Sequence, residues 1–154
     1  MEAEGIKVVM TRTGDGGLYD ENASNKTVQD MKRRLEIIEE ANPMLVVSIH
    51  QNSYHEEYVK GAQVFYYQTS ENSRRLAEML QEELKSLDAE NHREAKGNDS
   101  YYLLKKTSKP IAIVECGFLS NADDLSHLKT GSYRLQLAAV MLSSYMQYIR
   151  GMTT

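Results

Sequence analysis

The spacing of apolar and polar residues along the chain switches repeatedly between a two-residue and a helical period. Short apolar or alternating runs predict strands at five places. In chain order they are Ile6 to Thr11, Met44 to Ile49, Ala62 to Tyr67, Tyr101 to Leu104 and Pro110 to Val114.

Helical spacing predicts four helices between these strands. The first runs from Asn25, a plausible cap, to about residue 41, where Asn42 and Pro43 end it. Ser70 caps a long helix, Asn121 caps a short one that ends near residue 128, and the last helix covers about 132–149. Polar loops are expected over 52–60 and 88–100.

Strands that alternate with helices predict an α/β fold, specifically a mixed, mostly parallel sheet covered by helices on both faces. With 154 residues and 41% apolar content, the chain is expected to form a single domain over residues 1–154. The formal net charge is −4 and Lys and Arg are scattered, which argues against nucleic acid as the main partner. No apolar run approaches the ~20 residues that span a bilayer, and no signal-peptide pattern opens the chain.

Two predicted strands end on groups that bind metals or move protons. The run that begins at Met44 leads into His50, and the run that begins at Pro110 leads into Glu115. Sites in α/β folds are built at strand ends of this kind. A carboxylate at the end of a buried strand is costly unless it is paired, hydrated or bound to a metal, so an ion pair is the alternative explanation for Glu115. Cys116 follows on the same strand and is expected to be a packing residue, because its neighbours are apolar.

Four segments follow one another in the order and spacing of a known family. They are Thr11-Arg12-Thr-Gly-Asp15, Ser48-Ile-His50-Gln-Asn52, Gly61-Ala-Gln-Val-Phe-Tyr66 and Glu115-Cys-Gly-Phe-Leu-Ser-Asn121. Through them the chain resembles the zinc-dependent N-acetylmuramoyl-L-alanine amidases of the Amidase_3 type, and most of all the spore-cortex, germination-type members. The resemblance implies a zinc-dependent hydrolase of the amide bond between N-acetylmuramic acid and L-alanine in peptidoglycan, with His50 as a zinc ligand and Glu115 as the catalytic acid/base.

The sequence departs from the family pattern at its start. Family members begin with a strand that ends in a Gly-His-Gly-Gly type motif, and a glutamate opens the helix that follows; these supply two further zinc ligands. Neither feature is present, and the first dozen residues resemble the end of the family's first helix and its second strand. The resemblance therefore implies a catalytic domain that is N-terminally incomplete, lacking its first strand and helix, with Zn2+ bound weakly or not at all. The side of the sheet next to that strand is expected to be open.

Other candidate residues rest on weaker signals. Asn52 and Asn121 are candidates for orienting substrate, although a turn or cap role is an equal alternative for each. Arg93 lies where the family often has an arginine facing the substrate, with a solvated surface charge as its alternative. His55 and His92 lie in polar loops and match no metal position of the family.

Three hypotheses follow for function. The first is the amidase itself, the second is an inactive relative that binds cell-wall peptides, and the third is another metal-dependent amide hydrolase. For the amidase, the resemblance implies an extracytoplasmic location, in the cell wall or spore cortex, and peptidoglycan as the partner. No apolar surface helix beyond those of the core is predicted, so a monomer is expected.

Overall fold

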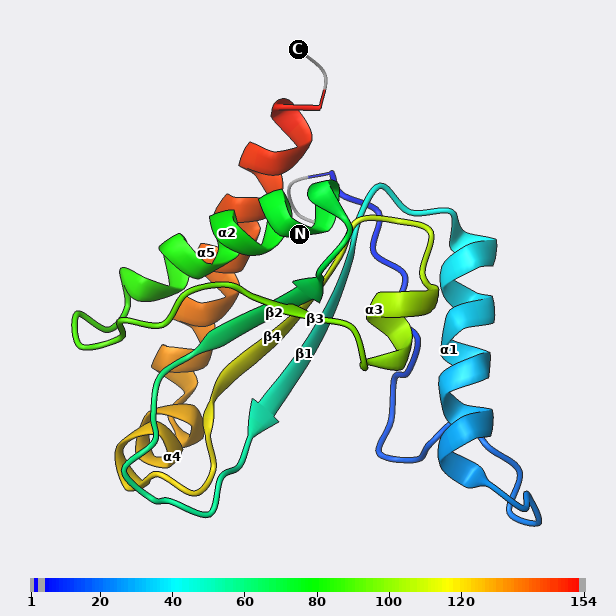
Figure 1. The fold of residues 1–154 in the computed structure, drawn as a ribbon, viewed down its shortest axis with the longest axis horizontal. Coiled ribbons are helices and arrows are strands. Elements are labelled where there is room, and N and C mark those ends of the chain that lie inside the picture. Colours follow the sequence, from blue (N-terminus) through cyan, green and yellow to red (C-terminus); the bar gives the residue numbers. More distant parts are fainter. Residues whose placement is uncertain (1, 3–4, 153–154) are drawn as a thin grey trace.

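A four-stranded mixed sheet forms the centre of the molecule (Figure 1). The computed structural model describes residues 2 and 5–152. Its strands are β1 (Val46–Asn52), β2 (Gln63–Tyr67), β3 (Lys96–Asn98) and β4 (Ile111–Phe118), and they lie in the order β1-β4-β2-β3. β1 is parallel to β4, β2 is antiparallel to β4, and β3 is parallel to β2. The predicted mixed, mostly parallel sheet is confirmed.

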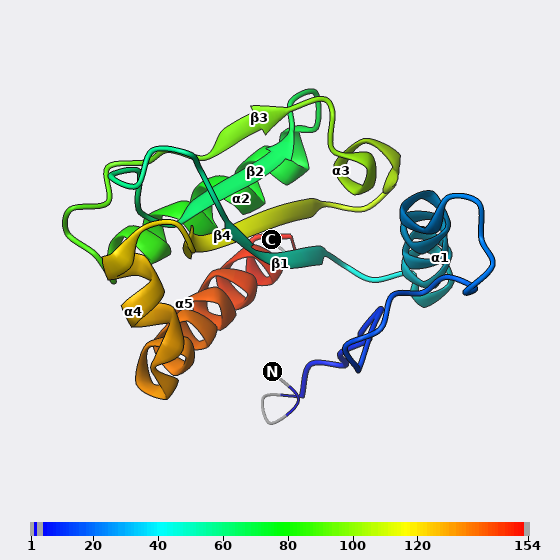
Figure 2. The same ribbon diagram turned by 90° about the horizontal axis from the view of Figure 1, so that it is seen from below.

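Helices lie on both faces of the sheet, as predicted (Figure 2). α2 (Glu71–Lys85) and α5 (Gly131–Arg150) cover one face, and α4 (Ala122–Lys129) packs against β4 and α5. α3 (Tyr102–Lys106) and α1 (Lys26–Ala41) lie on the other side, where α1 contacts α3.

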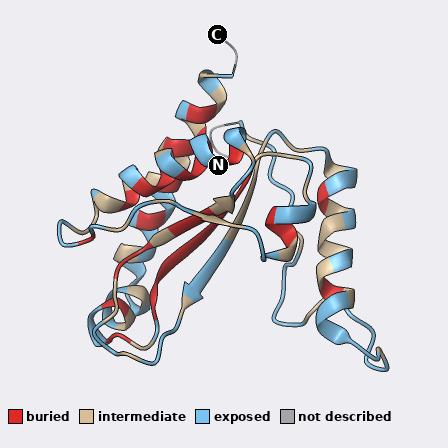
Figure 3. Cartoon of the chain, in the orientation of Figure 1, coloured by how far each residue is buried: buried red, intermediate tan, exposed pale blue. Residues whose placement is uncertain are grey.

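The alternation of side chains along β4 divides the core into two clusters. All eight residues of β4 are buried (red in Figure 3). Val114 and Cys116 point toward α2 and α5, where they join Leu76, Leu80 and Met141. Ile111 and Ile113 of β4 point to the opposite face of the sheet. There they form a second cluster with residues of α1, β2 and α3, namely Ile38, Phe65, Leu103 and Leu104. Glu115 continues this second row, so it is the position at which an apolar face turns polar.

Side-chain caps start three helices where the sequence predicts them. The side chains of Asn25, Ser70 and Asn121 accept hydrogen bonds from backbone N–H groups in the first turns of α1, α2 and α4. The last helix begins at Gly131, one residue before the expected start near 132, and the Thr130 side chain caps it.

Two predicted strands are wrong. Tyr101 to Leu104 belongs to a turn and to α3, because Asn98 Oδ1 accepts hydrogen bonds from the backbone N–H groups of Ser100 and Tyr101 and reverses the chain there. Adjacent Leu103 and Leu104 are both buried, which a helical turn allows and an alternating strand on one sheet face does not.

Ile6 to Thr11 is irregular rather than a strand. Met10 is 64% exposed, and the segment is tied to α1 by a hydrogen bond of 3.2 Å from Arg34 to the Thr11 hydroxyl. A strand needs a hydrogen-bonding neighbour, and none of the described residues pairs with this segment. Within those residues β1 likewise pairs only with β4, so the expected open side of the sheet is present.

The bounds of β1 and β4 differ from the prediction, and one strand was missed. β1 runs from Val46 to Asn52 instead of Met44 to Ile49, and β4 continues through Glu115 to Phe118 instead of ending at Val114. β3 lies within the predicted 88–100 loop, where its composition, Lys96-Gly97-Asn98, gives no apolar signal. Among the described residues, no helix has the length and apolar character needed to cross a bilayer.

Candidate active site

His50 and Glu115 lie side by side on neighbouring strands. They are register partners in the parallel pair of β1 and β4. Residues in register on adjacent strands point to the same face of the sheet, with their backbones about 4.8 Å apart. The two side chains therefore lie on one face, within reach of a single small group placed above the sheet.

The Glu115 carboxylate is buried and incompletely satisfied. The residue is 8% exposed, and its Oε2 has no hydrogen-bond partner among the residues that the structure describes. Burial raises the pKa of the Glu115 carboxyl. No cation is paired with it among the described residues, so the ion-pair explanation for its position does not apply. A carboxylate with a raised pKa and a free oxygen is suited to accept and return a proton.

His50 is held as a neutral imidazole. Its pKa is lowered first by burial and then by the positive charges of Arg34 and Arg12. One ring nitrogen, Nε2, lies 2.8 Å from the Ser48 hydroxyl. A neutral ring has a lone pair available for a metal or for a proton, and the two arginines maintain that state at lower pH.

Gln63 is a site residue that the sequence did not indicate. It is the antiparallel register partner of Glu115 on β2, so Gln63, Glu115 and His50 form one row across three strands. Its side chain donates a hydrogen bond of 3.1 Å to the Glu94 carbonyl and accepts one of 3.1 Å from Arg93. The sequence held one signal for Gln63. Side chains two residues apart on a strand share a face, so Gln63 lies on the same sheet face as the apolar Phe65.

Arg93 is fixed beside this row. Its Nε donates a hydrogen bond of 2.7 Å to the Lys60 carbonyl, and its guanidinium lies over the Phe118 ring, 4.8 Å from the centroid. Burial lowers the pKa of the guanidinium. The structure therefore makes Arg93 an anchored cation at the edge of the site rather than a freely solvated one.

The two candidate asparagines have clear structural roles. The Asn121 side chain caps α4 and donates a hydrogen bond of 2.8 Å to the Glu57 carbonyl, and the residue is 8% exposed. Asn52 follows an irregularity in the β1 register, and its side chain accepts a hydrogen bond of 2.8 Å from Ser53 N–H. The cap and turn alternatives are thus present, and both residues shape the loops around the row.

A buried carboxylate organises the end of β4. Asp124 Oδ2 accepts hydrogen bonds from Phe118 N–H at 2.8 Å and from Gly61 N–H at 2.9 Å. Gly117, the residue before Phe118, has a positive φ of 152°. A Cβ at this position would lie 3.1 Å from Asp124 Oδ2. Asp124 thereby joins the end of β4 to the segment that enters β2, which carries Gln63.

The described residues do not by themselves fit a zinc site. A catalytic zinc takes three protein ligands and keeps one open position. Across residues 2 and 5–152 no group of three or more His, Cys, Asp or Glu side chains is placed to hold a metal ion. His55 is exposed and stacks on Tyr54, and His127 lies against Tyr133 on α4 and α5, so neither joins His50.

We expect this chain to bind zinc weakly. His50 is one ligand where three are needed, so elemental analysis after extensive dialysis should give well below one zinc per chain. A His50→Ala variant should lose the zinc that remains, whereas His127→Ala, a matched change at a distant histidine, should retain as much zinc as the unmodified chain. Stoichiometric zinc after dialysis would contradict this ligand count.

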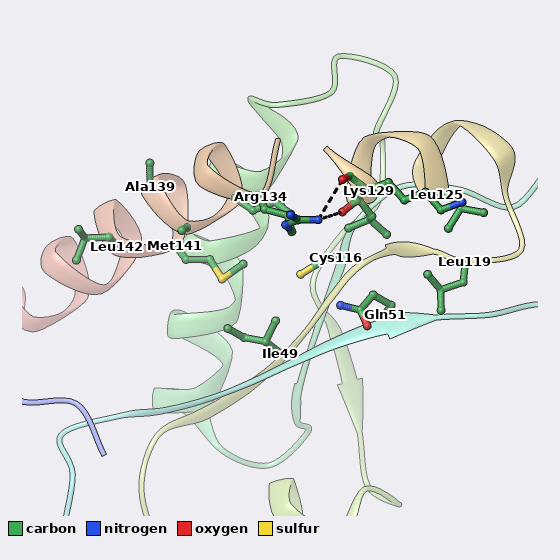
Figure 4. A pocket seen from close by; sticks show the side chains of 13 residues that line it. Ile49, Gln51, Cys116, Leu119, Leu125, Lys129, Arg134, Ala139, Met141 and Leu142 are labelled. Atoms are coloured by element: carbon green, nitrogen blue, oxygen red, sulfur yellow. Dashed lines mark hydrogen bonds between the residues drawn. The ribbon is translucent and has the colours of Figure 1, made fainter. Parts of the chain in front are cut away.

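A large apolar hollow lies on the opposite face of the sheet (Figure 4). It has a volume of about 690 Å3 and extends between β1, the end of β4, α4 and α5, where Arg134 donates to the Leu128 and Lys129 carbonyls. Cys116 lines it, whereas Glu115 on the same strand points away. Burial raises the pKa of the Cys116 thiol to about 12, so the thiol stays protonated and acts as a packing group, as expected. The hollow is therefore separate from the row of His50, Glu115 and Gln63.

Together, an open mixed sheet with helices on both faces and a buried carboxylate beside an imidazole define an α/β enzyme domain. A family model described as N-acetylmuramoyl-L-alanine amidase matches residues 1–144, and the chain belongs to this family. Its members in the comparisons include the germination-specific N-acetylmuramoyl-L-alanine amidase of Bacillus subtilis, 30% identical over 151 residues, which cover 96% of this chain and 64% of the relative.

Solved structures give the same result. The CwlD amidase from Clostridioides difficile, solved in complex with the GerS lipoprotein, superposes with a TM-score of 0.92 and 36% identity over 97% of this chain and 78% of that one. The catalytic domain of CwlV from Bacillus (Paenibacillus) polymyxa shares the fold at a TM-score of 0.79 and 22% identity, over 94% of this chain and 73% of its own. The chain thus spans somewhat less than two thirds of the length of the germination-specific relative.

Proposed function

We propose that this chain belongs to a peptidoglycan amidase that hydrolyses the bond between N-acetylmuramic acid and L-alanine, with zinc held in part by His50. The observation that carries the proposal is the register pair of His50 and Glu115, in which a neutral imidazole lies beside a buried carboxylate with a free oxygen. The family membership and the germination-specific relative support the choice of substrate and of spore cortex.

In this proposal Glu115 moves the proton. It accepts a proton from the water whose oxygen attacks the amide carbon, and it then delivers that proton to the nitrogen as the carbon–nitrogen bond breaks. A raised carboxyl pKa favours the second step, because the protonated form then persists closer to neutral pH. A zinc ion held in part by His50 would supply a more acidic water and would polarise the carbonyl.

The neighbouring polar groups are proposed to position the substrate. Arg93 has two of its donor groups occupied by Lys60 and Gln63, which fixes the direction of those that are left. A fixed guanidinium suits a carboxylate or carbonyl of a stem peptide. Asn52 and Asn121 act on the substrate through the loops that they shape.

The test is digestion of purified peptidoglycan by zinc-loaded protein, followed by identification of the new ends. Amidase action should release peptides with a free L-alanine amino group and leave intact glycan strands. New amino groups at another position in the stem peptide would instead indicate a different amide hydrolase.

An inactive, wall-binding relative is the second candidate. The observation that favours it is that residues 2 and 5–152 bring no group of three or more His, Cys, Asp or Glu side chains together to hold a metal ion. If the chain is such a relative, it should sediment with peptidoglycan and expose no new L-alanine amino groups at any zinc concentration.

An extracytoplasmic location, in the wall or cortex, follows from the same proposal. The CwlD structure contains a lipoprotein, GerS, and a protein partner of this kind is a proposal for this chain as well. A monomer is the prediction for the chain alone, and its molar mass in solution checks it.

A further inference from the structure

Tyr101 stands over the sheet face that carries Glu115. Its ring meets the Phe65 ring edge-on, with centroids 5.6 Å apart and an interplanar angle of 77°. Phe65 lies two residues after Gln63 on β2, so both side chains share the face on which Gln63 pairs with Glu115. The aromatic ring is therefore placed at the side of the row of His50, Glu115 and Gln63.

The position of Tyr101 is fixed by the turn that precedes α3. Asn98, the last residue of β3, accepts a hydrogen bond of 2.8 Å from Tyr101 N–H, and β3 is itself paired with β2. The ring is thus held both by its own backbone and by Phe65, which keeps the loss of side-chain entropy on ligand binding small.

The Tyr101 hydroxyl is available for a ligand. The residue is 37% exposed, and no hydrogen bond of its hydroxyl is found within residues 2 and 5–152. The negative charge of Glu115 adds to the effect of burial in raising the pKa of Tyr101, which agrees with a hydroxyl that lies in the field of the carboxylate. The group therefore stays protonated as a donor near the reacting amide.

We propose that Tyr101 binds the substrate beside Glu115: its ring forms one wall of the site, and its hydroxyl donates a hydrogen bond to the muramoyl-peptide. This inference rests on the proposed function, because it takes the same substrate. Tyrosine suits the task, since it offers a rigid apolar surface with a polar end.

The experiment measures binding of a soluble probe, N-acetylmuramoyl-L-alanyl-D-isoglutamine, to the chain by NMR with labelled tyrosine rings. Tyr101→Phe removes only the hydroxyl and keeps the contact with Phe65. We expect the dissociation constant to rise about 2- to 10-fold, the equivalent of one hydrogen bond, with an unchanged melting temperature. The Tyr101 ring resonances should shift in the wild-type protein when the probe is added.

Tyr102→Phe is the matched control, because it removes the same atom one residue further along α3, and it should bind the probe as the wild type does. Equal affinities of wild type and Tyr101→Phe, with binding by the wild type established, would overturn the role of Tyr101 and leave the amidase proposal standing. If the wild type neither binds nor cleaves muramoyl-peptides, the proposed function itself fails.

Discussion

Replacing Glu115 by glutamine should lower amide hydrolysis by about 10²–10⁴-fold, the usual contribution of general acid/base catalysis. The change keeps the size of the side chain and removes the group that carries the proton. Initial rates at which new L-alanine amino groups appear in peptidoglycan digests, with zinc supplied, measure the effect. His50→Ala should also lose activity and, unlike Glu115→Gln, should lose whatever zinc the protein holds.

The same substitution is expected to stabilise the fold at neutral pH. Because the folded-state pKa of Glu115 is raised, the folded protein binds more protons than the unfolded chain between pH 4.5 and that raised value, and stability falls as the pH rises through this interval. Glutamine has no such loss, so relative to the wild type Glu115→Gln should be more stable at pH 7 than at pH 4. Thermal unfolding at the two pH values checks the sign.

Glu40→Gln is the control for both effects, because Glu40 is exposed on α1. This variant should keep the wild-type activity. Its free energy of unfolding should change little, and by the same amount at pH 4 and pH 7. A Glu115→Gln protein that hydrolyses peptidoglycan at the wild-type rate would remove Glu115 from the mechanism, and a loss of stability at pH 7 would show that the buried carboxylate has a partner.

Replacing Asp124 by alanine should destabilise the protein by about 2–4 kcal/mol. The change leaves the N–H groups of Gly61 and Phe118 without their acceptor, and a buried unsatisfied donor costs about 1–3 kcal/mol. For a domain of this size the melting temperature should fall by about 5–10 °C. The end of β4 and the start of β2 should also separate, which displaces Gln63 from Glu115 and lowers activity.

Asp123→Ala provides the comparison, since it removes the same charge from the same helical turn without touching either N–H group. It should cost well under 1 kcal/mol, the usual effect of an acidic residue at a helix N-terminus. Similar losses in both variants would mean that charge in the first turn of α4, and not the two buried hydrogen bonds, determines stability.

Much of the fold could be predicted from local signals. Asn25, Ser70 and Asn121 mark helix starts, and the apolar run before Glu115 marks the central strand; these signals depend on residues that are neighbours in sequence. Tyr101 to Leu104 was misassigned because its helix depends on the turn made by the Asn98 side chain, for which strand-like composition gives no warning.

The candidate site was predictable only in part. His50 and Glu115 stand out because each interrupts an apolar run, and the register of β1 and β4 then places them together. Gln63 and Tyr101 reach the same place through antiparallel pairing and through a ring contact with Phe65, both of which are set by the tertiary structure. Asp124 reads as an ordinary acidic residue in a first helical turn until its two backbone donors are seen.

His50 and Glu115 lie on strands that differ in local stability. β4 is buried along its full length between two partners, whereas Ile49 on β1 is 58% exposed, and among the described residues β1 bonds to β4 alone. Amide hydrogens of β1 should therefore exchange with solvent well before those of β4. Glu115 then serves as the stationary member of the pair while the imidazole fluctuates with its strand, and any ligand held between them slows exchange chiefly in β1.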